Sequence, residues 1–381
     1  MAAEDRECDN RTMEPVTSQQ EIGRRVSTAR DDASLTQAEL AASIGIDRTS
    51  VAKIESGARK VSATELVAIA QTLDRPIDWF VVESPPAIVS RRRSSAGGRT
   101  ATSLDRRVEQ LARDVSYLVG EHILLRVDRP SFTVPESHEA AEELARQARA
   151  ALGIDTGALP DLQRACERVG LLAFSLDLGD GGGDAAYVEA DGLGVALVNG
   201  AVEPGRRRFN LAHELAHHLV GDEFSAEVSI GSVNGTEQLL NAVAIHLLMP
   251  RAAVAEVWQQ RSDLDDRLRA VAVAARFRVS WTATCNHLRT VGLLNGARRD
   301  ELVESPPVKG DFFEVGERWE PELVPPSVPP HYASRVIHAY RCGKLTTART
   351  GELLWGTVTP AELPDVEDVP LPALRRELEP L

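Results

Sequence analysis

The spacing of His213, Glu214 and His217 restricts the fold of this chain more than any other feature. Positions 213–217 read His-Glu-Leu-Ala-His inside 209–220, where apolar residues recur at helical spacing. Side chains four residues apart on a helix lie on one face, about 5–6 Å apart at Cβ, so the two histidines can share one tetrahedral zinc. Glu214 can then take a proton from water during attack on a peptide carbonyl. The spacing favours a zinc site over a helix that bears two histidines by chance.

A catalytic zinc also needs a third protein ligand and an open position. The candidates near the motif are Asp222, Glu223, Glu227, Glu237 and His246. Glu237 is favoured because it opens a second helical pattern, stopped by Pro250, after a loop long enough for the two helices to lie side by side. Asn241 follows four residues later on the same face, where it either orients a ligand or is a solvated amide. His218 and His246 are interpreted as ordinary, partly buried histidines.

The two helical patterns together resemble the ImmA/IrrE metallopeptidases. RRRFNLAHELAHHL and the stretch from Glu237 to Pro250 follow the family pattern RFTLAHELGH, then E-x-x-A-N-x-F-A-x-x-L-L-M-P. The resemblance covers about residues 140–295 and departs from the pattern only at positions that hold no ligand: Asn210, Ala216, Leu240 and Val243. It implies an α+β zincin-like domain with a gluzincin-like ligand set, in which His213, His217 and Glu237 bind Zn²⁺ and Glu214 is the catalytic base. It also implies cleavage of a repressor or antitoxin-like protein.

The region before residue 84 has the helix-capping and turn residues of a small all-α domain. Thr36 with Glu39, and Ser62 with Glu65, form capping boxes, Asp47 can cap another helix, and Gly45 supplies a turn. Five short helices fit between residues 21 and 80. The helix after Asp47 carries Arg48, Thr49, Ser50 and Lys53, which suit a major groove, and Gln37 suits a phosphate.

This region resembles the Xre/Cro-type helix-turn-helix domains, which have the lambda-repressor-like fold, over about residues 20–83. TQ-x-x-LA, the V-x-x-I-E-x-G stretch and the closing L-x-x-IA-x-x-L all stand in register. The resemblance implies binding to double-stranded operator DNA and is compatible with a homodimer. A helical bundle used for protein contacts is the alternative. The arginines at 91–93 are either a phosphate-contacting arm or part of a solvated linker.

Charge and composition assign these activities to separate domains. The formal net charge is −14, yet residues 20–107 hold 14 basic against 11 acidic residues, so DNA contact belongs to the N-terminal part. The four scattered cysteines indicate neither disulfides nor a thiolate site. Without a long apolar stretch or a signal pattern, a cytoplasmic protein without membrane contact is expected.

The multidomain organisation predicted from these patterns has five parts. They are a disordered tail (1–18), a helix-turn-helix domain (19–84), a linker with a connecting helix (85–135), a metallopeptidase domain (136–299) and a Pro-rich acidic extension (300–381). Three short strands are expected between residues 171 and 199.

The main functional hypothesis is a DNA-binding regulatory zinc metallo-endopeptidase. It would cut a partner protein and thereby control transcription, with the substrate peptide laid along a sheet edge beside the zinc helix. The alternative is a transcription regulator whose zinc domain is a sensor with little or no peptidase activity. A toxin-antitoxin module fused in one chain is a third, weaker hypothesis.

Overall fold

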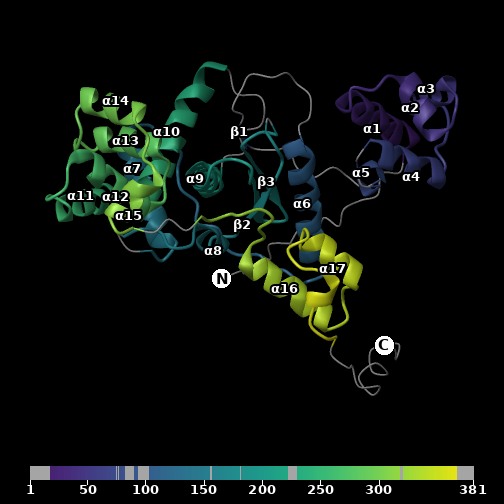
Figure 1. The fold of residues 1–381 in the computed structure, drawn as a ribbon. Helices are drawn as coiled ribbons and strands as arrows, with labels where there is room; N and C mark the ends of the chain where they lie inside the picture. Colours follow the sequence, from purple (N-terminus) through teal and green to yellow (C-terminus); the bar gives the residue numbers. More distant parts are fainter. Residues whose placement is uncertain are drawn as a thin grey trace, which may run out of the picture. The chain divides into compact units, whose positions relative to one another are not determined.

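The fold is described from a computed structural model of the chain. The described residues are 18–73, 75, 77–81, 90–92, 103–154, 157–180, 182–221, 230–317 and 321–366. They form two compact units, residues 18–81 and residues 90–92 with 103–366, and each is described by itself (Figure 1).

The N-terminal unit consists of five helices, which confirms the predicted all-α layout. They are α1 (Gln19–Asp32), α2 (Gln37–Ile44), α3 (Arg48–Glu55), α4 (Ala63–Thr72) and α5 (Asp78–Val81). Both predicted capping boxes are present, at the N-termini of α2 and α4, and the Asp47 side chain caps α3. These side chains accept hydrogen bonds from N–H groups that have no partner within the helix, which fixes where each helix begins.

The second unit is built around one small mixed sheet. Its strands are β1 (Ser90–Arg92), β2 (Leu171–Leu176), β3 (Ala185–Ala190) and β4 (Leu193–Asn199), in the order β1-β3-β4-β2. β4 is antiparallel to β3 and parallel to β2, and β1 pairs antiparallel with β3, Arg91 opposite Ala186. The three strands predicted between 171 and 199 are therefore present. β1 lies in the segment predicted to be a linker, where no strand was expected.

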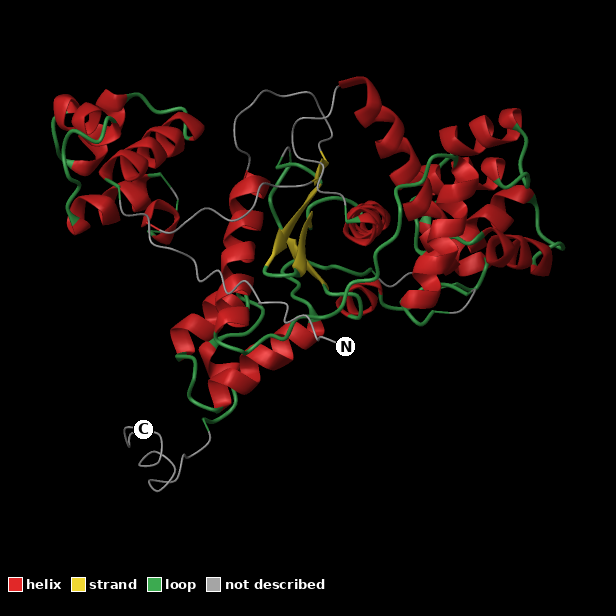
Figure 2. Cartoon of the chain, turned by 180° about the vertical axis from the view of Figure 1, so that it is seen from behind, coloured by secondary structure: helices red, strands yellow, loops and turns green. Residues whose placement is uncertain are grey.

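Alternation along the strands separates two apolar cores. On β4, Ala196 and Val198 belong to the core shared with the helices α7 to α13, whereas Val195 and Leu197 belong to the core on the opposite face. That opposite face is covered by α6 (Ser103–Gly120), α16 (Pro330–Arg341) and α17 (Thr347–Leu353). Figure 2 shows the sheet between its helical layers. Helix α6, which precedes residues 213–217, and helices α16 and α17, which follow them, thus share one core.

The other helices of this unit either lie on the sheet face that carries residues 213–217 or come after those residues in the sequence. They are α7 (His138–Ala151), α8 (Leu162–Glu167), α9 (Pro204–Val220), α10 (Ile230–Leu248), α11 (Arg251–Gln260), α12 (Asp266–Phe277), α13 (Trp281–Thr290), α14 (Gly296–Glu304) and α15 (Lys309–Glu314), with a 3-10 turn at Pro360–Glu362.

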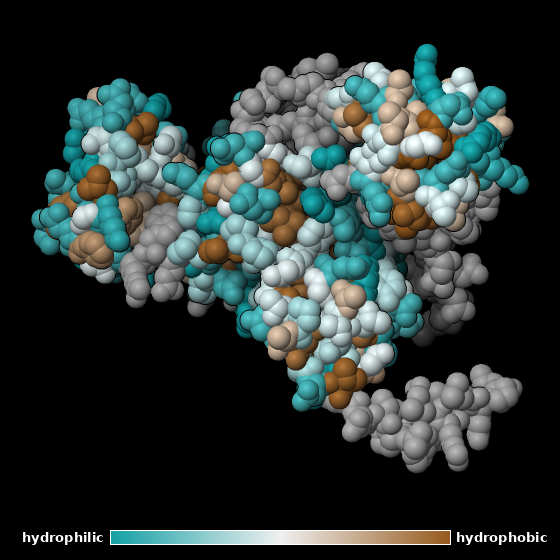
Figure 3. Space-filling model, turned by 45° about the vertical axis from the view of Figure 1, so that its right-hand side comes forward, coloured by the Kyte–Doolittle hydropathy of each residue, from teal (hydrophilic) through white to brown (hydrophobic). Residues whose placement is uncertain are grey.

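In the described ranges, no single helix is both long and apolar enough to cross a membrane. Residues 235–248 and 251–260 meet that test only as a pair, which is bent by 47°. On the face seen in Figure 3, apolar side chains form small patches separated by hydrophilic ones.

Candidate metal centre and helix-turn-helix surface

Helix α9 places the predicted metal-site residues in the interior of the second unit. Pro204 stands at its first turn, where a missing N–H costs no hydrogen bond, and Gly221 ends it in the left-handed conformation. The helix packs between the sheet and α10. His213, Glu214 and His217 are consequently only 1%, 0% and 4% exposed.

Three side chains from α9 and α10 converge on one point. The Nε2 atoms of His213 and His217 lie 3.1 Å apart. The Glu237 carboxylate lies 3.3 Å from His213 Nε2 and 3.4 Å from His217 Nε2. Two ligand atoms bound at about 2.0–2.1 Å to one tetrahedral ion lie about 3.3 Å apart. The spacing of these atoms therefore fits a single metal ion, and imidazole with carboxylate is a donor set that divalent metals take.

Glu237 reaches this point from the half-buried side of α10. Its side chain is 42% exposed. Burial raises the pKa of Glu237, but the hydrogen bonds with His213 and His217 outweigh burial and lower that pKa below its ordinary value. The structure thus favours the charged form of this carboxylate, which is the form that binds a metal.

The other candidate third ligands do not join this group in the described structure. His246 lies further along α10, with its Nε2 3.9 Å from Glu142 and its ring stacked edge-on against His287. Asp222, Glu223 and Glu227 fall outside the described residues.

Glu214 has an environment that packing does not explain. It is fully buried, and neither carboxylate oxygen has a hydrogen-bond partner within the described residues. Leaving a buried polar group unpaired costs about 1–3 kcal/mol, and more when it is charged. Nδ1 of His213, the preceding residue, is also buried without a partner. A metal ion with a water or substrate beside it would supply the missing partners of this carboxylate.

His218, the neighbour of the motif, fills a structural position instead. Its Nε2 donates a hydrogen bond to the Val169 carbonyl at 2.8 Å, and its Nδ1 lies 3.0 Å from the Tyr187 hydroxyl. Burial lowers the pKa of His218 to about 4, so the ring is neutral. A Cβ on Gly194 would lie 2.5 Å from His218 Nδ1, which explains why β4 carries a glycine here.

Asn241 has no ligand-orienting hydrogen bond in the described part of the chain. Its Oδ1 is buried without a partner, and the side chain lines a cavity beside the metal centre. Its proposed role in orienting a ligand stays a prediction. No local sequence pattern predicts this cavity, because its walls come from helices far apart in the chain.

The predicted DNA-contacting residues lie on the outer side of α3 and at the start of α2. Arg48, Thr49 and Lys53 are exposed, while Ser50 and Gln37 are half-buried. Val51 and Ile54, on the opposite side of α3, belong to the core of the unit. This division leaves one face of α3 available for DNA. The hydroxyls of Thr49 and Ser50 donate hydrogen bonds to the Asp47 carboxylate, so they also hold the helix N-terminus.

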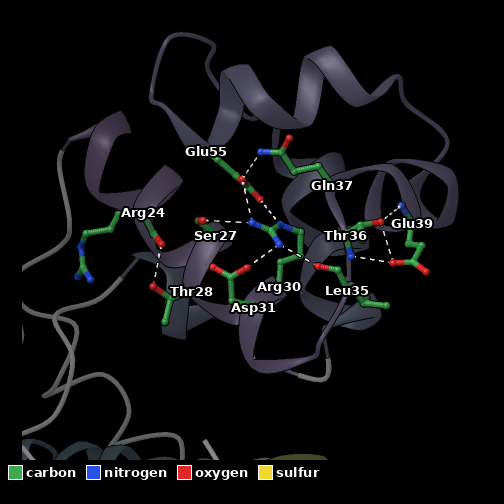
Figure 4. A network of polar contacts seen from close by, with 10 residues as sticks. All are labelled: Arg24, Ser27, Thr28, Arg30, Asp31, Leu35, Thr36, Gln37, Glu39 and Glu55. Carbon is green, nitrogen blue, oxygen red and sulfur yellow. Dashed lines mark hydrogen bonds and ion pairs between the residues drawn. The ribbon is translucent and has the colours of Figure 1, made fainter. Parts of the chain in front are cut away.

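Gln37 takes part in a polar network that fixes α1, α2 and α3 to one another (Figure 4). Its Nε2 donates a hydrogen bond to Glu55 at 2.8 Å, and Arg30 donates to the same carboxylate at 2.6 Å. The Arg30 guanidinium also donates to the Leu35 carbonyl. Arg30 and Glu55 were not predicted as a pair, because they stand far apart in sequence and no local pattern joins them.

Comparisons with known proteins match both units. The helix-turn-helix family matches residues 26–80, and the IrrE N-terminal-like domain of peptidase family M78 matches residues 166–289. A relative from Rhodospirillum rubrum, named an uncharacterized transcriptional regulator in the ATPase CF(0) region, is 38% identical over 74 residues. That match covers 19% of this chain and 67% of the relative.

Two solved structures show only a weak likeness. PlcR of Bacillus thuringiensis, in complex with the peptide PapR7 and DNA, is 12% identical with a TM-score of 0.17, covering 88% of this chain and 91% of that chain. ComR from Streptococcus suis is 12% identical with a TM-score of 0.16, covering 89% and 93%. The chain belongs to the helix-turn-helix transcription regulators, and its two family matches show a helix-turn-helix domain followed by an ImmA/IrrE-type, metallopeptidase-like domain.

Proposed function

We propose that the protein is a DNA-binding, zinc-dependent endopeptidase that acts in the cytoplasm, with its DNA-binding domain within residues 19–84 and its peptidase domain within 136–299. The observation that carries this proposal is the convergence of His213, His217 and Glu237 beside the unpartnered carboxylate of Glu214. Two histidines and a glutamate, with a position left open, form a ligand set of catalytic zinc.

Each residue has a separate task in peptide hydrolysis. His213, His217 and Glu237 would hold the ion, which when bound supplies a Lewis acid for the peptide carbonyl and activates water. Glu214 accepts the proton of the attacking water and delivers it to the leaving amine. Its burial keeps bulk water from satisfying the carboxylate, so the carboxylate stays available for this proton transfer.

The proposed substrate is a repressor or antitoxin-like protein that lies near the same DNA site. A tethered peptidase meets such a neighbour at an effective concentration of up to about millimolar. A substrate peptide could extend the sheet next to α9, but β3 is already paired on both sides and β2 carries a bridge on its outer side. β1 pairs with β3, and Ser327 forms a bridge with Ser175 of β2. An incoming peptide that uses the β3 edge must therefore replace residues 90–92.

The first experiment separates metal binding from hydrolysis. Zinc content is measured for the wild type, His213→Ala and Glu214→Gln, each isolated at equal concentration. We expect one zinc per chain in the wild type and in Glu214→Gln, and loss of zinc in His213→Ala. Full zinc content in His213→Ala would refute the metal site.

The second experiment asks whether the centre cuts a protein. Zinc-loaded wild type and Glu214→Gln are incubated with lysate of the source cells, and new protein N-termini are identified by mass spectrometry. We expect one cleaved partner with the wild type only. Zinc binding without any such fragment would refute the peptidase and favour the alternative, a regulator whose zinc domain is a sensor.

A further inference from the structure

We propose that β1 is an intramolecular inhibitor of the metal centre. Residues 90–92 occupy the side of β3 to which an extended substrate peptide adds, and the peptide binds there only after they leave. This inference rests on the proposed peptidase function and names how that site is regulated. It follows from the place of β1 beside α9, from the closed outer side of β2, and from the weakness of β1 as a strand.

The side of β3 that β1 occupies lies next to the metal-binding helix. β1 pairs with β3 and also contacts α9, all within the second unit (Figure 1). Ser90 lies opposite Tyr187, which belongs to the core that α9 shares. The Tyr187 hydroxyl lies 3.0 Å from Nδ1 of His218, the residue after the proposed ligand His217. A peptide in the place of β1 would therefore run beside the helix that supplies two of the three metal ligands.

The outer side of β2 is closed by contacts that do not involve the linker. The backbones of Ser175 and Ser327 exchange two hydrogen bonds, of 2.9 and 2.8 Å. Gln163 Nε2 donates to the Ala173 carbonyl at 2.7 Å. Residues two apart on a strand present their backbone groups to the same side, so Ala173 and Ser175 belong to one edge. Because these groups already have partners from the body of the unit, the incoming peptide is expected on the β3 side.

β1 is a weak strand by length and composition. β3 and β4 pair along six residue positions, whereas β1 and β3 pair along three. β1 reads Ser-Arg-Arg, and these residues are neither β-branched nor aromatic, the two classes that favour strands. It also lacks the apolar alternation that fixes the register of a half-buried strand. β1 can therefore leave β3 while the other strands of the sheet stay paired.

A tether lets this weak strand compete with a free peptide. Ten residues, 93–102, join Arg92 to the start of α6 at Ser103. A segment on a short linker meets its site at an effective concentration on the order of millimolar. A substrate at lower concentration replaces β1 only if it gains a further contact. Coordination of its peptide carbonyl by the metal is such a contact.

The competition concerns backbone groups rather than side chains. A peptide that extends a sheet binds through main-chain hydrogen bonds, and β1 pairs with β3 in the same way. Each net backbone hydrogen bond changes an equilibrium by about two- to tenfold. Loss of the β1 pairing should therefore raise the affinity for an extended peptide by about tenfold or more, because several such bonds no longer compete.

A disulfide can lock β1 in place. Arg91 lies opposite Ala186. Directly opposite residues of an antiparallel pair have Cα atoms about 4.5–5.5 Å apart, which is within the range of a disulfide. Arg91→Cys with Ala186→Cys therefore locks β1 when oxidised and frees it when reduced. Arg92→Cys with Ala185→Cys repeats the lock at the neighbouring position.

A second variant keeps β1 away from β3. Replacing each of residues 90–92 by proline removes every N–H group of the strand and leaves the length of the linker unchanged. The single variants Arg91→Cys and Ala186→Cys, treated with the same oxidant, are the controls for the lock. They should behave as the wild type does.

The test measures binding to the zinc-loaded full-length protein by calorimetry. Acetohydroxamate reports on the metal alone, and a tetra-alanine peptide with a C-terminal hydroxamate reports on the metal and the side of β3 together. We expect the peptide probe to bind the proline variant about tenfold or more tightly than the wild type. The oxidised double-cysteine variant should bind both probes with similar affinity, and reduction should restore the wild-type value. Acetohydroxamate should bind all forms to within about twofold.

Equal affinity of the peptide probe for the wild type, the proline variant and the cross-linked protein would overturn the inference. Failure of both cysteine pairs to cross-link would also overturn it, because β1 would then not lie on β3. If acetohydroxamate binds no form, the metal centre and its inhibitor are refuted together. The expected affinities in a protein that cuts nothing in lysate would support the inhibitor and refute the peptidase function. Equal affinities in a protein that cuts its partner would do the reverse, so the two failures are distinguishable.

Discussion

His287 should make the second unit sensitive to mild acid. It stands on α13, is 2% exposed, and donates a hydrogen bond from Nε2 to the Met249 carbonyl at 2.8 Å. Burial lowers its pKa from the ordinary 6.5 to about 4, and the positive charge of a protonated His246 and of Arg251 acts in the same direction. The hydrogen bond to Met249 and the charge of Glu142 oppose this change without cancelling it.

The sign and size of the effect follow from that difference in pKa. Between pH 6.5 and pH 4 the unfolded chain holds a proton on this histidine that the folded chain does not, so the free energy of unfolding falls as the pH falls. For these two pKa values, the loss between pH 7 and pH 5 is about 2 kcal/mol. At neutral pH both states are mostly unprotonated, and this contribution to stability is fully present.

The variant His287→Gln tests this reasoning, because glutamine keeps a donor for Met249 and does not titrate. Urea unfolding, followed by tryptophan fluorescence between pH 7 and pH 5 in the presence of a chelator, gives the free energy of unfolding at each pH. The chelator removes any contribution of metal binding. We expect the variant to lose about 2 kcal/mol less than the wild type over this range. His331→Gln, on an exposed residue of α16, is the matched control. Parallel curves for wild type and His287→Gln would refute the argument.

Three further predictions concern the other parts of the chain. Glu55→Ala should destabilise the N-terminal unit by about 1–3 kcal/mol in thermal unfolding, because Arg30, whose side chain is 11% exposed, loses one of its two carboxylate partners and keeps only Asp31; an unchanged melting temperature would contradict this. Lys53→Ala should weaken operator binding and reduce the slope of log K against log salt by about 0.9, as measured by fluorescence anisotropy; an identical slope would exclude a phosphate contact. Deletion of residues 90–92 removes the strand that pairs with β3, so cleavage of the partner protein should become faster in a gel assay; an unchanged rate would show that substrate does not use the β3 edge.

Local chemistry explains what could be predicted from the sequence. The capping boxes, the Asp47 cap and the turn at Gly45 depend on residues within one helical turn of each other, so their signals stand in the sequence. The spacing of His213 and His217 is equally local. Glu237 required a different step, since its nearness to the two histidines depends on how α10 returns beside α9. The loop length and the second helical pattern favoured it among five candidates, and the family resemblance pointed to the same residue.

Long-range pairing explains what the sequence did not reveal. β1 has no apolar alternation, and it is a strand only because its backbone pairs with β3, almost a hundred residues later. The second core likewise joins α6, the sheet and α16. Tyr332 of α16 meets the ring of Phe174 of β2 at a centroid distance of 5.1 Å. The cavity beside the metal centre is formed by helices spread from α7 to α13. No local sequence pattern encodes contacts between elements that lie so far apart in the chain.

The burial of α9 gives the strongest physical reason to assign chemistry to its polar residues. Almost every side chain of this helix is buried. Buried helix positions usually carry apolar residues, as Leu211, Leu215 and Leu219 do here. An unpaired polar group there costs about 1–3 kcal/mol, a large share of the stability of an ordinary domain. His218 avoids this cost through its two hydrogen bonds, whereas neither carboxylate oxygen of Glu214 has a hydrogen-bond partner in the described part of the chain. A leucine at position 214 would leave no polar atom unpaired, so the glutamate is best explained by the proton transfer that we propose for it.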